Sequence, residues 1–234
     1  MQAVVLAGGL GTRLGEMTRD RPKALLSIAG RPFLAWLVEA LARSGYRKLV
    51  LCIGHYGQKI VEFLGDGGSF GLDVSYSEDG QPLLGTGGAI RRALERQLLA
   101  ESFLVTYGDS YLPFDYAAPL RDLEAHPEAR GTMSVFENRG AWDASNCAIG
   151  RGLVLRYEKG AQDGALTHID YGAIALRRSV IEEQPAQVAF GLDVLQQRLA
   201  RAGLLRAFEA GERFYEIGSE RGIADLELKL GKSR

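Results

Sequence analysis

Residues that build metal clusters and disulfide frameworks are scarce in this chain of 234 residues. It has two cysteines, Cys52 and Cys147, and three histidines. The cysteines have neither the spacing of zinc ligands nor a disulfide-rich context, and the histidines are scattered, which argues against a zinc site. Cys52 lies inside the apolar run LVLCI, so we expect it to be a buried free thiol.

Long apolar runs and an excess of charge are also missing. No window reaches the roughly 18 apolar residues of a membrane span, and the first residues, MQAVVLAGG, do not form a signal peptide. The formal net charge is −1, so no basic excess attracts nucleic acid or an anionic membrane. We therefore expect a cytoplasmic protein with neither partner, which binds any anion through a local site.

The chain does contain apolar runs of strand length that alternate with segments of helical period. In the first half, strands are predicted over 2–7, 48–54, 72–77 and 102–108, and helices over 31–45, 57–65 and 87–99. This order is typical of a Rossmann-like, doubly wound α/β fold, with a mainly parallel sheet and helices on both faces.

The second half has a more mixed pattern. Strands are predicted over 131–138, 147–160, 167–178, 206–210 and 213–218, the last two around a Gly-Glu turn, and helices over 191–203 and 219–230. Ser219 is the expected N-cap of the last helix. Because there is no internal repeat, low-complexity tract or long linker, we expect one domain over 1–234, with a substrate lobe grown from its second half.

The stretch LAGGLGTRLGEMTRDRPKAL, from Leu6 to Leu25, follows the first predicted strand. It is neither a Walker A loop nor a G-x-G-x-x-G loop. Its glycines let backbone N–H groups approach phosphate oxygens, and Arg13 and Lys23 add positive charge to such a site. A glycine-rich turn without a ligand is the alternative interpretation of the glycines alone.

Ligands of open α/β sheets bind beyond the carboxyl ends of the strands. At that edge we expect the glycine loop to meet the GTGG stretch, 85–88, which opens a helix beginning near Ala89, and Asp109, which follows the strand FLVTYG. A carboxylate beside a phosphate loop is well placed for Mg²⁺, which prefers oxygen ligands and keeps several waters. A turn or helix-capping role is the alternative for Asp109.

Together these motifs resemble the sugar-1-phosphate nucleotidylyltransferases. LAGGLGTRL followed by RPKALLSIAGRPFL is similar to the family signature, with Ala24 where proline is commoner. LLGTGGAI resembles the family's base-binding segment, YGDSY its metal motif, YEKG its sugar-phosphate motif, and FYEIGSERGIADLE a further conserved block. The resemblance implies a single catalytic domain of the GT-A-like nucleotidyltransferase fold, without the C-terminal β-helix of many relatives.

The implied reaction joins a sugar 1-phosphate to the nucleoside monophosphate of an NTP and releases pyrophosphate. A phosphate oxygen attacks the α-phosphorus, so positioning and charge neutralisation matter more than a strong base. By resemblance, Arg13 holds the leaving pyrophosphate, Lys23 neutralises charge near the α-phosphate, and Asp109 holds Mg²⁺. The nucleotide-binding residues implied are Leu6, Gly8, Gly9, Gly11, Thr12, Arg13, Gly85, Thr86 and Gly88.

On the sugar side, the resemblance implies that Glu158 contacts the hydroxyls and Lys159 the phosphate; an exposed charged hairpin is the alternative for this YEKG segment. Two departures from the family pattern stand out. Glu216 replaces the second metal aspartate, and Asp170 stands where asparagine normally meets the sugar. Asp170 signals either a different hydroxyl pattern or a structural role.

The motifs look most like those of D-glycero-α-D-manno-heptose 1-phosphate guanylyltransferases, which favours GTP and a role in capsule or surface polysaccharide synthesis. Mannose-1-phosphate guanylyltransferase and N-acetylmuramate- or hexose-1-phosphate uridylyltransferase are the alternatives, and a homodimer is an open expectation. The alternative that is not an enzyme is an inactive, regulatory homologue that binds sugar nucleotides. GGLGTR lacks the Rossmann dehydrogenase pattern, and GDSY lacks the D-x-D of a metal-dependent glycosyltransferase.

Overall fold

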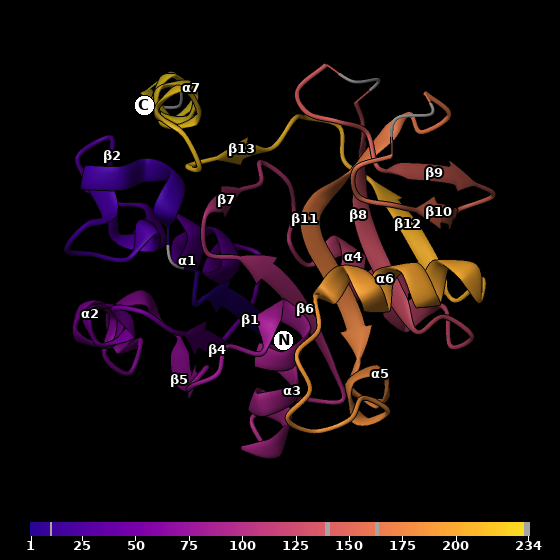
Figure 1. The fold of residues 1–234 in the computed structure, drawn as a ribbon, viewed down its shortest axis with the longest axis horizontal. Coiled ribbons are helices and arrows are strands. Elements are labelled where there is room, and N and C mark those ends of the chain that lie inside the picture. Colours follow the sequence, from indigo (N-terminus) through magenta and orange to yellow (C-terminus); the bar gives the residue numbers. More distant parts are fainter. Residues whose placement is uncertain (10, 139–140, 162–163, 232–234) are drawn as a thin grey trace.

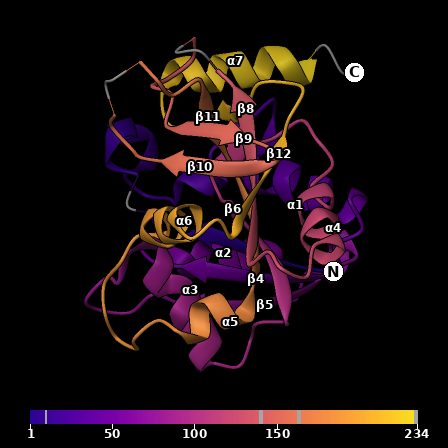
Figure 2. The same ribbon diagram turned by 90° about the vertical axis from the view of Figure 1, so that its right-hand side faces the viewer.

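The computed structural model describes residues 1–9, 11–138, 141–161 and 164–231 (Figure 1). Its centre is a nine-stranded sheet of order β5-β4-β1-β6-β11-β8-β12-β10-β9, with helices on both faces. Helices α7 (Glu220–Gly231) and α5 (Arg178–Glu182) lie at opposite ends of the molecule (Figure 2). Among the described residues, no helix has the length and apolar character needed to cross a membrane.

The first half forms the predicted parallel part of the sheet. It contains β1 (Gln2–Ala7), β4 (Lys48–Ile53), β5 (Asp73–Glu78) and β6 (Ser102–Tyr107), with α1 (Phe33–Arg43), α2 (Gly57–Leu64) and α3 (Gly85–Glu95) between them. Strand β1 pairs with β4 on one side and β6 on the other, all parallel. The doubly wound prediction is therefore confirmed.

The sequence of β1 is almost entirely apolar because both faces of the strand are buried. Ala3, Val5 and Ala7 point into a core shared with α1, α2, α4 and α7, whereas Val4 and Leu6 point into a core shared with α3, α5 and α6. Because side chains alternate between faces, a strand covered on both faces is apolar along most of its length. The exception in β1 is Gln2, whose side-chain amide donates to the Leu98 carbonyl oxygen and accepts the Ala100 N–H. The loop that follows is thus anchored on a fully buried strand.

The second half adds β8 (Gly131–Glu137), β9 (Cys147–Gly150), β10 (Leu153–Tyr157), β11 (His168–Arg177) and β12 (Leu205–Glu209) to the same sheet. Strand β11 runs antiparallel to β6 and β8, as the mixed pattern predicted. The segment 147–160 is a hairpin whose turn, Arg151 and Gly152, has positive φ at both residues. Two consecutive residues of positive φ match the twist of the flanking strands.

The two short strands expected around a Gly-Glu turn do not pair with each other. Strand β12 pairs with β8 and β10, whereas β13 (Tyr215–Glu216) pairs with β7 (Ser110–Tyr111). The turn residues predicted a local hairpin, but each strand finds its partner far away in the sequence. This correction matters because β7 directly follows Asp109.

Several helix bounds also differ from the sequence expectation. Helix α3 begins at Gly85, earlier than the expected start near Ala89, and the GTGG stretch opens it as predicted by forming its first turn. Helix α1 begins at Phe33 because Arg31 and Pro32 form strand β3, which pairs with β2 (Ser27–Ile28). The N-cap prediction is confirmed: Ser219 Oγ accepts the Gly222 N–H at 3.1 Å, at the start of α7 (Glu220–Gly231).

Three further helices complete the layers: α4 (Ala118–Ala125), α5 (Arg178–Glu182) and α6 (Leu192–Arg201). The sequence patterns predicted α6 but not α4 or α5. Short 3-10 turns lie at Thr12–Thr18, Lys23–Leu25 and Gly68–Phe70.

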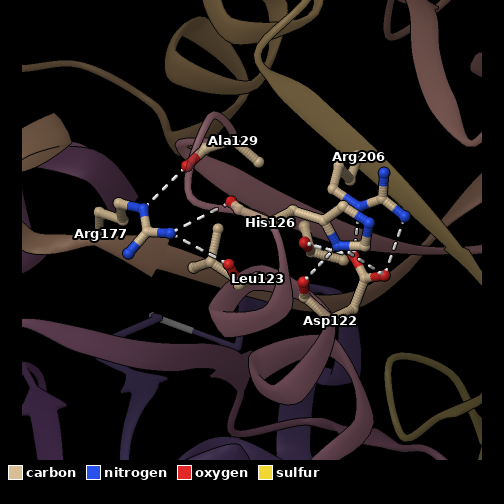
Figure 3. A network of polar contacts seen from close by, with 7 residues as sticks. Asp122, Leu123, His126, Ala129, Arg177 and Arg206 are labelled. Carbon is tan, nitrogen blue, oxygen red and sulfur yellow. Dashed lines mark hydrogen bonds and ion pairs between the residues drawn. The ribbon is translucent and has the colours of Figure 1, made fainter.

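Polar side chains bind α4 to the sheet (Figure 3). Arg206 of β12 donates from Nε and Nη2 to the Asp122 carboxylate at 2.7 and 3.0 Å, and Thr132 of β8 donates to Asp122 Oδ2 at 2.9 Å. Arg177 donates to the carbonyl oxygens of Leu123, His126 and Ala129. A cation at a helix C-terminus satisfies carbonyl groups that have no partner in the helix, so this contact stabilises the end of α4.

Candidate active site

A cavity of about 360 Å³ lies beyond the carboxyl ends of β1 and β6, next to the first turn of α3. The predicted site residues that line it are Leu6, Gly8, Gly9, Gly11, Lys23, Gly85, Thr86 and Asp109. These residues come from four separate parts of the sequence, and the parallel strands bring them to one edge of the sheet. The cavity also has an apolar lining that includes Cys52, Leu83 and Ala89.

The glycine loop forms one wall of this cavity. A Cβ at Gly8 would collide with Asp79 Oδ2, so glycine is the residue that lets the loop lie this close to the end of β5. Gly11 has a φ of 67°, and its carbonyl accepts a hydrogen bond from Thr18 Oγ1 at 3.0 Å. The side chains of Thr12 and Arg13 lie outside the described part of the structure, so their predicted phosphate contacts stay predictions.

Lys23 and Asp109 form an ion pair in the cavity. Lys23 Nζ donates to Asp109 Oδ2 at 2.6 Å, and the lysine side chain is only 12% exposed. The sequence motifs suggested separate tasks for these two residues, and the structure places them in direct contact. A poorly solvated lysine beside the glycine loop can act as a strong electrostatic partner for an anion that enters the cavity.

Glu216 reaches this region through the β7–β13 pair. Glu216 lies opposite Ser110 in the ladder, and the Ile217 N–H donates to the Asp109 carbonyl oxygen at 3.0 Å. Within the described ranges, no group of three or more His, Cys, Asp or Glu side chains is arranged to hold a metal ion. Asp109 lines the cavity, whereas Glu216 is exposed and is not among the lining residues. Asp109 alone suits Mg²⁺, because this ion keeps several waters and takes further oxygens from substrate phosphates.

The base-binding segment predicted from LLGTGGAI is fastened to the start of α6. The Gly87 and Gly88 N–H groups donate to the Phe190 carbonyl oxygen, and Thr86 Oγ1 accepts the Leu192 N–H at 2.8 Å. Gly85 and Thr86 line the cavity, whereas Gly88 is buried and is not among the lining residues. A Cβ at Gly88 would collide with the Leu84 side chain, so packing explains this glycine.

The structure holds Asp170 in a network of its own. Its Oδ2 accepts from Gln196 Nε2 at 2.8 Å and from the Tyr157 hydroxyl at 3.2 Å, and its Oδ1 accepts the Gly172 N–H at 3.0 Å. Both carboxylate oxygens therefore have protein partners, which favours the structural role left open from the sequence.

Glu158 and Lys159 lie just past the end of β10 and are both exposed. Glu158 Oε2 accepts hydrogen bonds from Arg156, the shorter one at 2.6 Å. Neither residue lines the cavity that contains the glycine loop, Lys23 and Asp109. Their predicted contacts with a sugar phosphate therefore belong to a surface outside this cavity.

Tyr107 lines the cavity and lies within electrostatic reach of Asp170, and the sequence motifs did not single it out. Burial raises the pKa of its hydroxyl, and the carboxylates of Asp170, Asp109, Asp193 and Glu216 raise it further. The hydroxyl therefore stays protonated and keeps its capacity to donate. Its place directly before Gly108 and Asp109, at the end of a predicted strand, was the signal that could have found it.

Asp79 was also missed, although it follows a predicted strand in the segment SYSEDG. It lies at the carboxyl end of β5 and lines the cavity opposite Gly8. Burial raises the pKa of its carboxyl group to about 6, against the opposing effect of Arg92 and Arg96. A carboxylate directly after a strand was the same signal that identified Asp109.

Comparison with known proteins decides the family. A model described as nucleotidyl transferase matches residues 2–142 of the chain. The chain belongs to the nucleotidyl transferase family. The resemblance read from the motifs is thereby confirmed, as are the mixed α/β fold and the assignment as a transferase enzyme.

Two relatives and one solved structure are similar along different lengths. D-glycero-alpha-D-manno-heptose 1-phosphate guanylyltransferase of Campylobacter jejuni is 36% identical, over 93% of this chain and 95% of the relative. N-acetylmuramate alpha-1-phosphate uridylyltransferase of Neisseria meningitidis is 34% identical, over 55% of each chain. HddC from Yersinia pseudotuberculosis, complexed with GMP-PN, has a TM-score of 0.78 at 28% identity, over 98% of this chain and 99% of HddC.

For a nucleotidyl transferase, the cavity has the parts that transfer to phosphorus requires. The glycine loop offers backbone N–H groups, Lys23 offers a cation, and Asp109 offers carboxylate oxygens. The apolar lining around Leu83 and Ala89 suits the faces of a base. The sequence patterns therefore predicted most of the cavity, but not the direct pairing of Lys23 with Asp109.

Proposed function

We propose that this nucleotidyl transferase joins the nucleoside monophosphate of GTP to D-glycero-α-D-manno-heptose 1-phosphate and releases pyrophosphate. The observation that carries the transfer reaction is the cavity in which the glycine loop faces the Lys23–Asp109 pair. We further propose that residues 1–234 form one catalytic domain and that the product serves capsule or surface polysaccharide synthesis.

In this proposal the glycine loop and Arg13 bind the triphosphate, with Arg13 on the departing pyrophosphate. The α-phosphate competes with the Asp109 carboxylate for Lys23, because both are anions within reach of one ammonium group. Lys23 then neutralises charge at the phosphorus under attack. Asp109 and Glu216 would hold Mg²⁺, which supplies further neutralisation of the phosphate oxygens.

The attacking oxygen of the sugar 1-phosphate is already an anion and needs no strong base. Lys159 and Glu158 are the proposed contacts for the sugar phosphate and hydroxyls, and Asp170 shapes that side through Tyr157 and Gln196. The rate then depends on holding the two phosphates in line and apart from water.

The choice of GTP and of the heptose is supported by two comparisons. The relative from Campylobacter jejuni is named a heptose 1-phosphate guanylyltransferase, and HddC was solved with GMP-PN. The relative from Neisseria meningitidis is named a uridylyltransferase, which keeps uridylyl transfer as a second candidate. Mannose 1-phosphate is the further candidate acceptor.

A substrate matrix tests the proposal. Five nucleoside triphosphates are each combined with a panel of sugar 1-phosphates that includes the heptose, with Mg²⁺, and pyrophosphate release is measured. We expect the highest kcat/KM for GTP with the heptose 1-phosphate. Higher kcat/KM for another pair would replace the substrate assignment. Absence of pyrophosphate with every pair would identify the chain as an inactive sugar-nucleotide-binding homologue.

A further inference from the structure

Asp79 is the one acidic residue of the cavity wall that phosphate transfer does not use. It lies at the end of β5, next to the glycine loop, and only the absence of a side chain at Gly8 leaves room for its Oδ2. Its backbone carbonyl oxygen accepts a hydrogen bond from Arg92 of α3, which fixes the backbone at this position. The carboxylate therefore has a defined place between the loop and α3.

Among the described residues, none donates a hydrogen bond to Oδ1, the enclosed oxygen of this carboxylate. An enclosed oxygen without a donor is costly, and native proteins retain such groups chiefly where a ligand or water completes them. The cavity that Asp79 lines is the site proposed for the nucleotide, so the missing donors belong to a part of that ligand.

The phosphates cannot supply these donors, because they are anions and would repel a carboxylate. The base can, and the neighbouring wall suits a base: Leu6, Cys52, Leu83 and Ala89 are apolar and line the same cavity. A carboxylate has two acceptor oxygens side by side and accepts best from two donors side by side. Asp79 thus selects among bases by the arrangement of donors on their edge.

Guanine alone among the common bases has two adjacent donors on its pairing edge, N1–H and the N2 amino group. Uracil and thymine have a single N–H between two carbonyl oxygens, and adenine and cytosine place an acceptor nitrogen beside their amino group. A carboxylate facing any of these four would meet an acceptor as well as a donor. The donor pattern that fits Asp79 is therefore that of guanine.

We infer that Asp79 is a specificity-determining residue that accepts hydrogen bonds from N1–H and the N2 amino group of guanine. This inference rests on the proposed nucleotidyl transfer and names the residue that selects GTP within it. For both oxygens to face the base, the carboxylate turns about its Cβ–Cγ bond, a torsion that is broad and inexpensive for aspartate. The turn also gives the enclosed Oδ1 the donor that it lacks.

The test varies both the donors on the edge of the base and the donor and acceptor groups of the side chain at position 79. Wild type, Asp79→Asn and the control Asp73→Asn are assayed for kcat/KM with GTP, inosine triphosphate, xanthosine triphosphate and UTP. Inosine lacks the 2-amino donor, and xanthine has a carbonyl oxygen in its place. Asp73 is exposed at the opposite end of β5, so its substitution makes the same chemical change away from the cavity.

We expect wild type and Asp73→Asn to prefer GTP over inosine triphosphate by roughly 10- to 100-fold, the value of a hydrogen bond to a charged group. Asp79→Asn should lose this preference and gain activity with xanthosine triphosphate, because its amide presents one acceptor and one donor to xanthine. A gain with one nucleotide cannot come from a misfolded variant.

Three results would overturn the inference: an unchanged GTP preference in Asp79→Asn, an equal loss with all four nucleotides, or a wild type that prefers UTP. Each leaves the transfer reaction standing. If wild type releases no pyrophosphate with any pair, the proposed function fails instead. Equilibrium binding of GTP, inosine triphosphate and xanthosine triphosphate to the same three proteins then still decides the role of Asp79, by the same pattern of affinities.

Discussion

Replacing Asp79 by asparagine should stabilise the ligand-free protein at neutral and alkaline pH. Burial raises the pKa of the Asp79 carboxyl group from 3.8 to about 6, so the fold disfavours the ionised form. One pKa unit corresponds to about 1.4 kcal/mol, so the rise sets an upper bound of about 3 kcal/mol on the cost to the native state, and solvent screening reduces this cost because the group is only partly buried. Asparagine has nearly the same shape and carries no charge.

The raised pKa of Asp79 determines how the stability difference changes with pH. Between pH 4 and pH 6 the native state binds more protons than the unfolded state, so the free energy of unfolding of wild type falls as pH rises. Above pH 6 the whole cost is present. The stability difference between Asp79→Asn and wild type should thus grow from near zero at pH 4 to as much as about 3 kcal/mol at pH 8.

Urea unfolding at pH 4, 5, 6, 7 and 8, without nucleotide, measures this difference directly. Asp73→Asn is the matched control, since its carboxylate is exposed, and its difference from wild type should stay small at every pH. An Asp79→Asn variant that is no more stable than wild type at pH 8 would contradict the reasoning. A gain of equal size at pH 4 would also contradict it, because the cause would then not be ionisation.

Three further changes have expected outcomes. Asp109→Asn should reduce pyrophosphate release by at least about 100-fold at saturating Mg²⁺ while the circular dichroism spectrum is unchanged; wild-type rates would remove Asp109 from the metal site. Gly85→Ala should lower stability by roughly 1–2 kcal/mol in urea unfolding, because Gly85 has a φ of 73° and its new Cβ would lie 2.7 Å from the Phe190 carbonyl oxygen. Asp122→Ala should cost about 2 kcal/mol, because it leaves the partly buried Arg206 guanidinium without its carboxylate; an unchanged urea midpoint would contradict each of the last two.

Apolar runs of strand length and segments of helical period predicted the parallel first half of the fold. The run QAVVLA is apolar after Gln2, and in the structure all six residues of β1 are buried between two helical layers. The glycine loop then had to leave the buried strand at its carboxyl end. Asp109 and Gly85 were predicted to reach the same cavity mainly because both lie at the carboxyl edge of the sheet, and less because of any single motif.

Helices without a strong local sequence pattern were not predicted. Helix α4 has the sequence APLRDLEA, with a proline in its first turn and only two large apolar residues, Leu120 and Leu123, on its buried face. Its stability comes from distant groups, namely Arg177 at its C-terminus and Arg206 at Asp122. Short elements of this kind depend on tertiary contacts that propensity does not contain.

The site was predictable in its parts and less so in its pairings. Motifs predicted Lys23 and Asp109 separately, but an ion pair between residues so distant in the chain has no periodic signature. Asp79 escaped notice because no recognised motif includes it, although it shares with Asp109 its place at the end of a strand. Its role became visible only through its contact with Gly8 and its enclosed, unpaired oxygen within the described structure.

The pairing of β7 with β13 has a consequence for how the enzyme matures. The two strands contribute two residues each, and they join parts of the chain that emerge from synthesis far apart in time. Closing so long a loop carries an entropic cost that the rest of the fold must first offset. The proposed metal site can therefore assemble only after Tyr215, Glu216 and Ile217 have joined the fold, late in the synthesis of the chain.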